Sequence, residues 1–177
     1  MTGQIDVYVG TYSHNYGHVD GKGEGIYLFS YDEVDGALRP AGVASGIPDP
    51  AYLALSPNQR YLYSVNESLV LDGQPGGGVS AFAIDPTSSA LSLLNRQPSH
   101  GGFPCFLAVD ATGSMVVVAN HDGPSTVAYP IQPDGSLGDA SAIISHRGKS
   151  HQAAHPGDPH PHSVILDSTN RFALVPD

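Results

Sequence analysis

The stretch Pro50-Ala-Tyr-Leu-Ala-Leu-Ser-Pro-Asn-Gln-Arg-Tyr-Leu-Tyr-Ser-Val-Asn66 decides the fold. It consists of a short apolar segment, a polar turn and a second apolar segment. Apolar runs of this length on either side of Ser, Pro and Asn are typical of two antiparallel strands joined by a tight turn. The stretch therefore predicts a β-hairpin.

The same pattern recurs twice, at residues 104–120 and 161–177, so the three starts lie 54 and 57 residues apart. A second kind of hairpin alternates with these copies along the chain, at residues 25–38, 78–91 and 125–137. Phe29, Phe82 and Tyr129 occupy one register in it. Alternating apolar and polar residues in these segments predict strands with a buried face.

Two hairpins per repeat of about fifty residues make four strands, which is one blade of a β-propeller. A generic β-sandwich, the alternative, would show no self-similarity at this period. No sustained helical period occurs, so we expect no substantial helix. The predicted fold is all-β: a β-propeller of four-stranded antiparallel blades.

Both ends of the sequence fall inside a blade. Residues 5–11 align with the second strand of the first hairpin type, so the first blade lacks its innermost strand. The last hairpin, at 161–177, lacks the outer two strands. About three blades are present, fewer than the ~4 that close a ring. We therefore expect residues 1–177 to be the N-terminal part of a single propeller domain, truncated in its fourth blade.

Composition narrows the function. Seven Lys and Arg against seventeen Asp and Glu give a net charge of −10, which argues against nucleic acid as a partner. No apolar run approaches the ~20 residues of a membrane helix, and the N-terminus lacks the basic and apolar segments of a signal peptide. The single Cys105 permits no internal disulfide. These features predict a cytoplasmic protein without a membrane partner.

Several motifs resemble the lactonase family of seven-bladed propellers, which includes bacterial-type 6-phosphogluconolactonases and fungal 3-carboxymuconate cyclases. They are Val7-Tyr-Val-Gly-Thr-Tyr12, Gly25-Ile-Tyr27, Pro57-Asn-Gln-Arg-Tyr-Leu-Tyr63, Val65-Asn-Glu67 and His160-Pro-His-Ser163. The resemblance runs in order along the chain and covers about the first half of a typical member. Asn120-His121 departs from it, because a second Asn-Glu would be expected there.

The resemblance implies hydrolysis of a sugar lactone, foremost 6-phospho-glucono-1,5-lactone, by an enzyme that needs no cofactor. In its cyclase branch it implies a catalytic His that matches His162, together with an Arg and a Glu from a blade beyond residue 177. Two alternatives stay open. One is a 3-carboxy-cis,cis-muconate cyclase type of lactonizing enzyme, and the other is a non-catalytic propeller that acts as a binding platform.

Hairpin geometry points to the same residues independently. The two ends of each hairpin meet on one face, and in a propeller these ends converge on the central channel. One mouth of that channel should therefore present side chains from three hairpins: Ala51, Asn66 and Glu67; Cys105, Asn120 and His121; His162 and Asp177.

Lactone hydrolysis needs an activated water and a donor for the oxygen that becomes negative. We expect His162 to act as the base, because an imidazole titrates near neutrality, and Glu67 to help orient water or substrate. Substrate-binding roles are expected for His160, Asn66, Asn120 and His121. The alternatives are structural: a hydrogen-bonded rim histidine, a capping carboxylate, and asparagines that only hold backbone groups.

The segment from His146 to His162 holds five of the nine histidines. Imidazole side chains bind zinc, copper and nickel, so a metal site is one hypothesis for this segment. The segment, however, contains no cysteine and lacks the regular strand or helix support expected of a structural zinc site. The sequence therefore favours a loop over the channel mouth with no metal, where Arg147 and Lys149 attract an anionic substrate.

Two further features have a structural interpretation. Cys105 occupies the register of His162, but no paired base that would make it a nucleophile is identifiable. The glycines at 76–78 precede a strand rather than a helix, so they form a strand-entry turn and not a phosphate loop.

Overall fold

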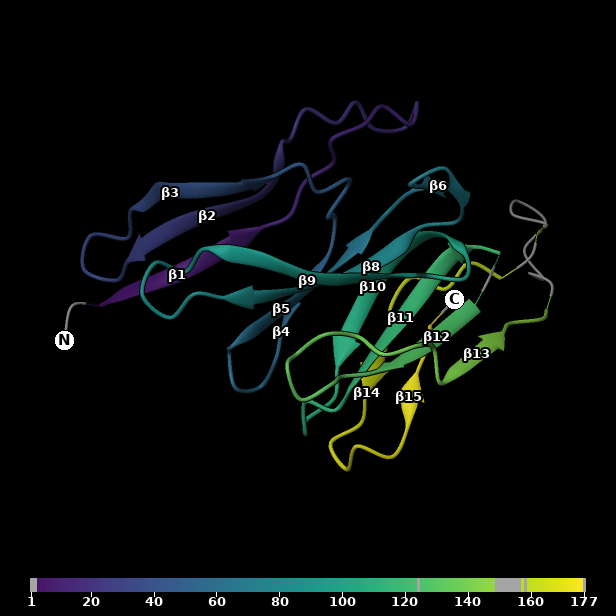
Figure 1. Ribbon diagram of the computed structural model, residues 1–177. Coiled ribbons are helices and arrows are strands. Elements are labelled where there is room, and N and C mark those ends of the chain that lie inside the picture. Colours follow the sequence, from purple (N-terminus) through teal and green to yellow (C-terminus); the bar gives the residue numbers. More distant parts are fainter. Residues whose placement is uncertain (1–2, 124, 149–156, 158, 177) are drawn as a thin grey trace.

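The computed structural model describes residues 3–123, 125–148, 157 and 159–176, and the regular elements within them are all β-strands (Figure 1). The strands form successive antiparallel sheets in chain order, followed by a two-stranded sheet that begins a fourth. No described residue lies in a helix that could cross a membrane. The all-β architecture predicted from the repeat is confirmed.

Within each sheet the strands follow one another along the chain. The first sheet has β1 (Gln4–Val9), β2 (Gly25–Asp32) and β3 (Leu38–Ser45); the second has β4 (Leu53–Leu55), β5 (Tyr61–Asn66), β8 (Gly78–Ile84) and β9 (Leu91–Pro98); the third has β10 (Gly102–Val109), β11 (Met115–Asp122), β12 (Ser125–Pro130) and β13 (Ala142–Ser145); the last has β14 (Ile165–Leu166) and β15 (Ala173–Leu174). A small hairpin, β6 (Val70–Leu71) and β7 (Gln74–Pro75), is inserted between β5 and β8.

Successive side chains of a strand point to opposite faces of its sheet. The middle strands are buried on both faces because a neighbouring sheet covers each face. In β5, Leu62 packs toward the first sheet with Ile26, whereas Tyr63 and Val65 pack toward the third. In β11, Val116 and Val118 face the second sheet, whereas Val117 faces the last one. Each pair of neighbouring sheets is therefore joined by its own apolar core.

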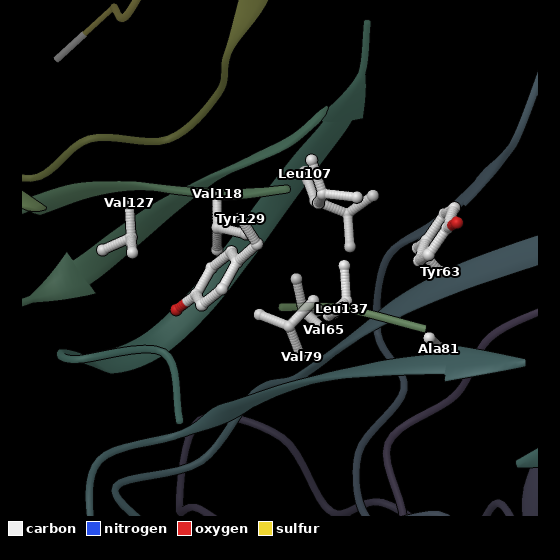
Figure 2. Close-up of a cluster of buried hydrophobic side chains, with 10 residues drawn as sticks. Tyr63, Val65, Val79, Ala81, Leu107, Val118, Val127, Tyr129 and Leu137 are labelled. Carbon is white, nitrogen blue, oxygen red and sulfur yellow. The ribbon is translucent and has the colours of Figure 1, made fainter. Parts of the chain in front are cut away.

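The largest of these cores lies between the second and third sheets (Figure 2). Tyr63, Val65 and Val79 from one sheet meet Leu107 and Val118 from the other. Buried tyrosine hydroxyls also find partners across this boundary: Tyr63 donates to the Gly135 carbonyl at 3.0 Å and Tyr129 to the Pro98 carbonyl at 2.6 Å. Both polar atoms are thereby satisfied inside the core.

The third sheet departs from the predicted repeat. Its outer strand begins at Ala142 rather than near Leu137. Leu137 instead forms an isolated bridge with Ile131 and is 2% exposed. Its backbone N–H and carbonyl both bond the side-chain amide of Asn95, at 2.9 and 2.7 Å. The neighbouring sheet thus holds this segment, and the outer strand begins further along the chain, at Ala142.

Asp49 ties the long β1–β2 loop to the start of the second sheet. Its carboxylate is fully buried and accepts hydrogen bonds from the Ser13 and His14 backbone N–H groups, from the His14 ring at 2.7 Å and from the Tyr16 hydroxyl at 2.6 Å. Burial acts to raise the pKa of Asp49, but the hydrogen bonds from Tyr16, Ser13 and His14 outweigh it and lower that pKa.

The 177-residue chain alone is predicted to self-associate. Within the described residues β1 has a strand partner, β2, on one of its edges alone, and the last hairpin exposes Phe172 and Leu174 by 62% and 58%. Unpaired edges and exposed apolar faces favour association. Sedimentation velocity over a concentration series should detect this association. The double variant Phe172→Ser and Leu174→Ser should associate only at higher protein concentration. Val34→Ser, in an exposed turn, is the matched control. A monomer with a sharp, reversible two-state melt would contradict this prediction.

Asp49→Asn should lower the urea midpoint of unfolding at neutral pH, because hydrogen bonds to a charged group stabilise by about 1.5–3 kcal/mol. The folded-state pKa of Asp49 is lowered, so this stabilisation is complete above the unfolded-state value of about 3.9 and is lost as pH falls through the folded-state pKa. The difference between the two proteins should therefore shrink in acid. Asp72→Asn, which removes an exposed ion pair with Arg96, is the control. Equal midpoints at neutral pH would refute the anchoring role.

Candidate functional site

A cavity of about 430 Å³ opens where the four sheets meet. It collects side chains from the β1–β2 loop, the end of β5, the third sheet and the segment before β14. Its lining consists of Tyr12, His18, Glu67, Phe103, Cys105, His121, Asp122 and His162. The hairpin argument predicted that Glu67, Cys105, His121 and His162 reach one mouth of the channel, and all four line this cavity.

Backbone hydrogen bonds between hairpin ends hold these residues in place. The Glu67 N–H donates to the Asp49 carbonyl at 2.9 Å, and the His162 N–H to the Pro176 carbonyl at 3.2 Å. The Phe103 N–H reaches across to the Ser68 carbonyl of the preceding sheet at 3.0 Å. A bulge between Pro104 and Phe106 interrupts the β10–β11 ladder at Cys105. Bulges re-aim side chains at the rims of sheets.

Glu67 is a buried carboxyl at the wall of the cavity, only 9% exposed. Burial raises its pKa above the ordinary value, while a hydrogen bond from the Tyr12 hydroxyl acts in the opposite direction. Burial and the same carboxyl raise the pKa of Tyr12, which keeps that phenol protonated as a donor. The pKa of Glu67 thus lies closer to neutrality than that of an exposed glutamate.

Three histidines cluster at the cavity, and two of them, His121 and His162, line it. The His121 ring stacks on His160, with centroids 4.3 Å apart, and meets His162 edge-on at 4.8 Å. Burial lowers the pKa of His121, and the neighbouring His160 and His162 lower it further. The Asp122 carboxylate, 3.4 Å from the Nδ1 atom of His121, acts against this shift. His121 is therefore predominantly neutral at physiological pH, with one N–H to donate.

Cys105 lines the cavity with its thiol directed at backbone carbonyls, the nearest being that of Pro161 at 3.4 Å. Burial, with the charge of Glu67, raises the pKa of the thiol to about 11. Only the thiolate is a strong nucleophile. The environment therefore works against the thiol-nucleophile hypothesis.

Asn66 and Asn120 lie inside the sheets and not on the cavity wall. Both are fully buried. The Asn66 amide donates to the Pro48 carbonyl at 2.8 Å, and its oxygen accepts from Ser80. The Asn120 amide donates to the Ser99 carbonyl at 2.7 Å. These contacts correspond to the alternative in which the asparagines hold backbone groups, rather than to the substrate-binding role expected from the sequence.

The remaining predicted residues stand near the cavity or outside the described part. His160 does not line the cavity, but its Nδ1 lies 3.2 Å from the His121 carbonyl oxygen. Arg147 is exposed and follows β13. Lys149, the histidines at 151 and 155, and Asp177 lie outside the described residues. The glycines at 76–78 lead into β8, which begins at Gly78, so they form the predicted strand-entry turn.

Four lining residues were not predicted: Tyr12, His18, Phe103 and Asp122. Tyr12 closes the motif Val7-Tyr-Val-Gly-Thr-Tyr12, which carries the family resemblance but gives no local sign of a place in the site. Its place at the cavity depends on the β1–β2 loop, which Asp49 holds through long-range hydrogen bonds. No local sequence pattern predicts those hydrogen bonds. Asp122 directly follows His121, and these two with His160 bring potential metal-ligand atoms within 4.8 Å of one another.

Comparison with known proteins agrees with this architecture. Residues 6–177 match the family described as lactonase, 7-bladed beta-propeller. A 6-phosphogluconolactonase of Bacillus subtilis (strain 168) is 36% identical over 171 residues, which is 96% of this chain and 45% of the relative.

Solved structures show the same fold. One structure, from Bacteroides fragilis, is 33% identical with a TM-score of 0.84. The match covers 97% of this chain and 45% of the Bacteroides fragilis chain. The periplasmic gluconolactonase of Pseudomonas aeruginosa is 27% identical with a TM-score of 0.84. This match covers 99% of the present chain and 47% of the Pseudomonas aeruginosa chain. The chain thus spans about half the length of these relatives, and it belongs to the family of seven-bladed β-propeller lactonases.

Proposed function

We propose that residues 1–177 are the N-terminal part of a seven-bladed propeller that hydrolyses a sugar lactone, 6-phospho-glucono-1,5-lactone above others, to the corresponding acid. The observation that carries the proposal is the shared cavity, which is lined by the buried Glu67 and by His121 and His162, whose rings lie 4.8 Å apart. The name of the Bacillus subtilis relative supports the substrate class. The single Cys105 favours the cytoplasm as the site of action.

The chemistry uses the groups already in place. His162 takes a proton from a water molecule as the water oxygen bonds to the lactone carbonyl carbon. The carbonyl oxygen becomes negative and accepts a hydrogen bond from the neutral His121. The ring carbon–oxygen bond then breaks, and the departing oxygen receives the proton from His162. Glu67, held by Tyr12, orients the water. No step of this scheme requires a metal or a cofactor.

The cyclase alternative uses the same pocket in the direction of ring closure, and it differs in the Arg and Glu expected from a blade beyond residue 177. The binding-platform alternative predicts lactone binding without turnover. Because blades beyond residue 177 supply part of the channel wall in either enzymatic case, we expect the 177-residue chain alone to be inactive.

His162→Asn in the complete seven-bladed protein should lower kcat for lactone hydrolysis by roughly 10²–10⁴-fold, the usual contribution of a general acid–base group. Hydrolysis must be measured above the spontaneous background reaction. His146→Asn is the control, because His146 bonds the Thr126 hydroxyl outside the cavity. An unchanged kcat in His162→Asn would remove this residue from the mechanism.

Glu67→Gln should lower activity by up to about 100-fold while stabilising the protein at neutral pH. A carboxyl with a raised folded-state pKa stabilises the protein fully below its unfolded-state pKa and loses that contribution as pH rises through the folded value. Gln avoids the resulting cost of a buried charge. Thermal melts at neutral pH and kcat measurements together test this, with Asp85→Asn, an exposed turn carboxylate, as control. A less stable Glu67→Gln variant would show that the carboxylate is a structural partner.

Arg147→Ala combined with Lys149→Ala should raise KM for a phosphorylated lactone and leave KM for the unphosphorylated lactone unchanged, because these cations attract the phosphate. The KM effect should shrink at high salt. A double variant of Arg39 and Arg60, which stand on other exposed turns and strands, removes the same charge and is the control. Equal KM values for both lactones in the two double variants would exclude a phosphate role for this segment.

A further inference from the structure

Three side chains with metal-ligating atoms meet at the edge of the cavity. His121 and Asp122 end β11, and His160 comes from the segment before β14. One ligand atom of each lies within 4.8 Å of the others. The cluster joins two neighbouring blades, so it differs from the run of histidines between residues 146 and 162, of which it uses only His160.

A backbone contact orients His160. Its Nδ1 lies 3.2 Å from the His121 carbonyl oxygen. A ring N–H that donates to a carbonyl leaves Nε2 as the basic nitrogen of the imidazole, and this arrangement is the usual outer-sphere support of a metal-bound histidine. The same contact keeps the His160 ring stacked on His121, with centroids 4.3 Å apart.

The composition of the cluster selects the type of ion. Two imidazoles and one carboxylate suit Zn²⁺, Co²⁺, Ni²⁺ or Cu²⁺, whereas Mg²⁺ and Ca²⁺ prefer oxygen ligands alone. Metal–nitrogen bonds of about 2.1 Å place neighbouring ligand atoms of a tetrahedral site about 3.4 Å apart. The cluster reaches this spacing by side-chain shifts of about 1 Å, which His160 and Asp122 can make because both are partly exposed to solvent.

We propose that His121, Asp122 and His160 form a reversible binding site for a divalent transition-metal ion, with Zn²⁺ as the prototype, at the edge of the cavity. Three protein ligands leave one position of a tetrahedral ion for water or another ligand, and the ring of His162 lies 4.8 Å from that of His121. Coordination occupies His121, so the ion inhibits the hydrolysis proposed above. This inhibitory consequence rests on the proposed function, whereas ion binding itself does not.

Binding is tested on the complete seven-bladed protein after treatment with a chelator. Titration with Co²⁺ should produce visible d–d absorption that saturates at one equivalent, and added Zn²⁺ should displace it. His160→Gln and Asp122→Asn should each weaken Co²⁺ binding by at least about tenfold. His146→Gln, outside the cluster, should bind as the parent protein does. A missing one-equivalent signal, or binding that both cluster variants retain at parent affinity, would overturn the site.

The lactone assay distinguishes the two proposals. Zn²⁺ at concentrations that displace Co²⁺ should inhibit hydrolysis by the parent protein, and inhibition of His160→Gln should need at least about tenfold more ion. Stoichiometric binding at the cluster with an unchanged rate would overturn the placement of the ion beside the reacting groups. A protein that binds the ion but hydrolyses no lactone would disprove the proposed function and leave the metal site standing.

Discussion

Burial of the middle strands on both faces is the constraint on which the rest of the structure depends. Because β5 and β11 each send alternate side chains into two different cores, no sheet can shift without opening an apolar interface on one side or the other. The close approach is visible at Gly135, where a Cβ would come within 2.2 Å of the Tyr61 ring. Packing of this kind places the hairpin ends at a common rim, and the cavity is a product of that placement.

The site belongs to the assembly of blades and not to any one of them. Two of its groups show how the surroundings act: Glu67 is buried beside a phenol, and His121 is crowded by two other imidazoles. Burial shifts the pKa of each toward its neutral form. A cavity with a carboxyl and an imidazole in such states has the groups that proton transfer requires, contributed by parts of the chain that are far apart in the sequence.

Much of this arrangement follows from local pattern. The recurring hairpin and its turn residues predict the sheets, and the position of a residue within the hairpin predicts that Glu67, Cys105, His121 and His162 share one rim. Features set by long-range contacts do not follow in this way. The β1–β2 loop reaches the cavity through Asp49, and the outer strand of the third sheet starts late because Asn95 of the neighbouring sheet holds Leu137. Asn66 and Asn120 carry polar side chains at the predicted register, yet their amides are used inside the sheets.

The bulge at Cys105 also bears on the durability of the protein. It seats a sulfur atom in the wall of the cavity, and burial beside the Glu67 carboxyl keeps it as a thiol across the whole physiological range. Oxidants such as peroxide attack the ionised form of cysteine, and here that form is scarce. The cavity can therefore contain a cysteine in its wall without becoming vulnerable to oxidation at that position.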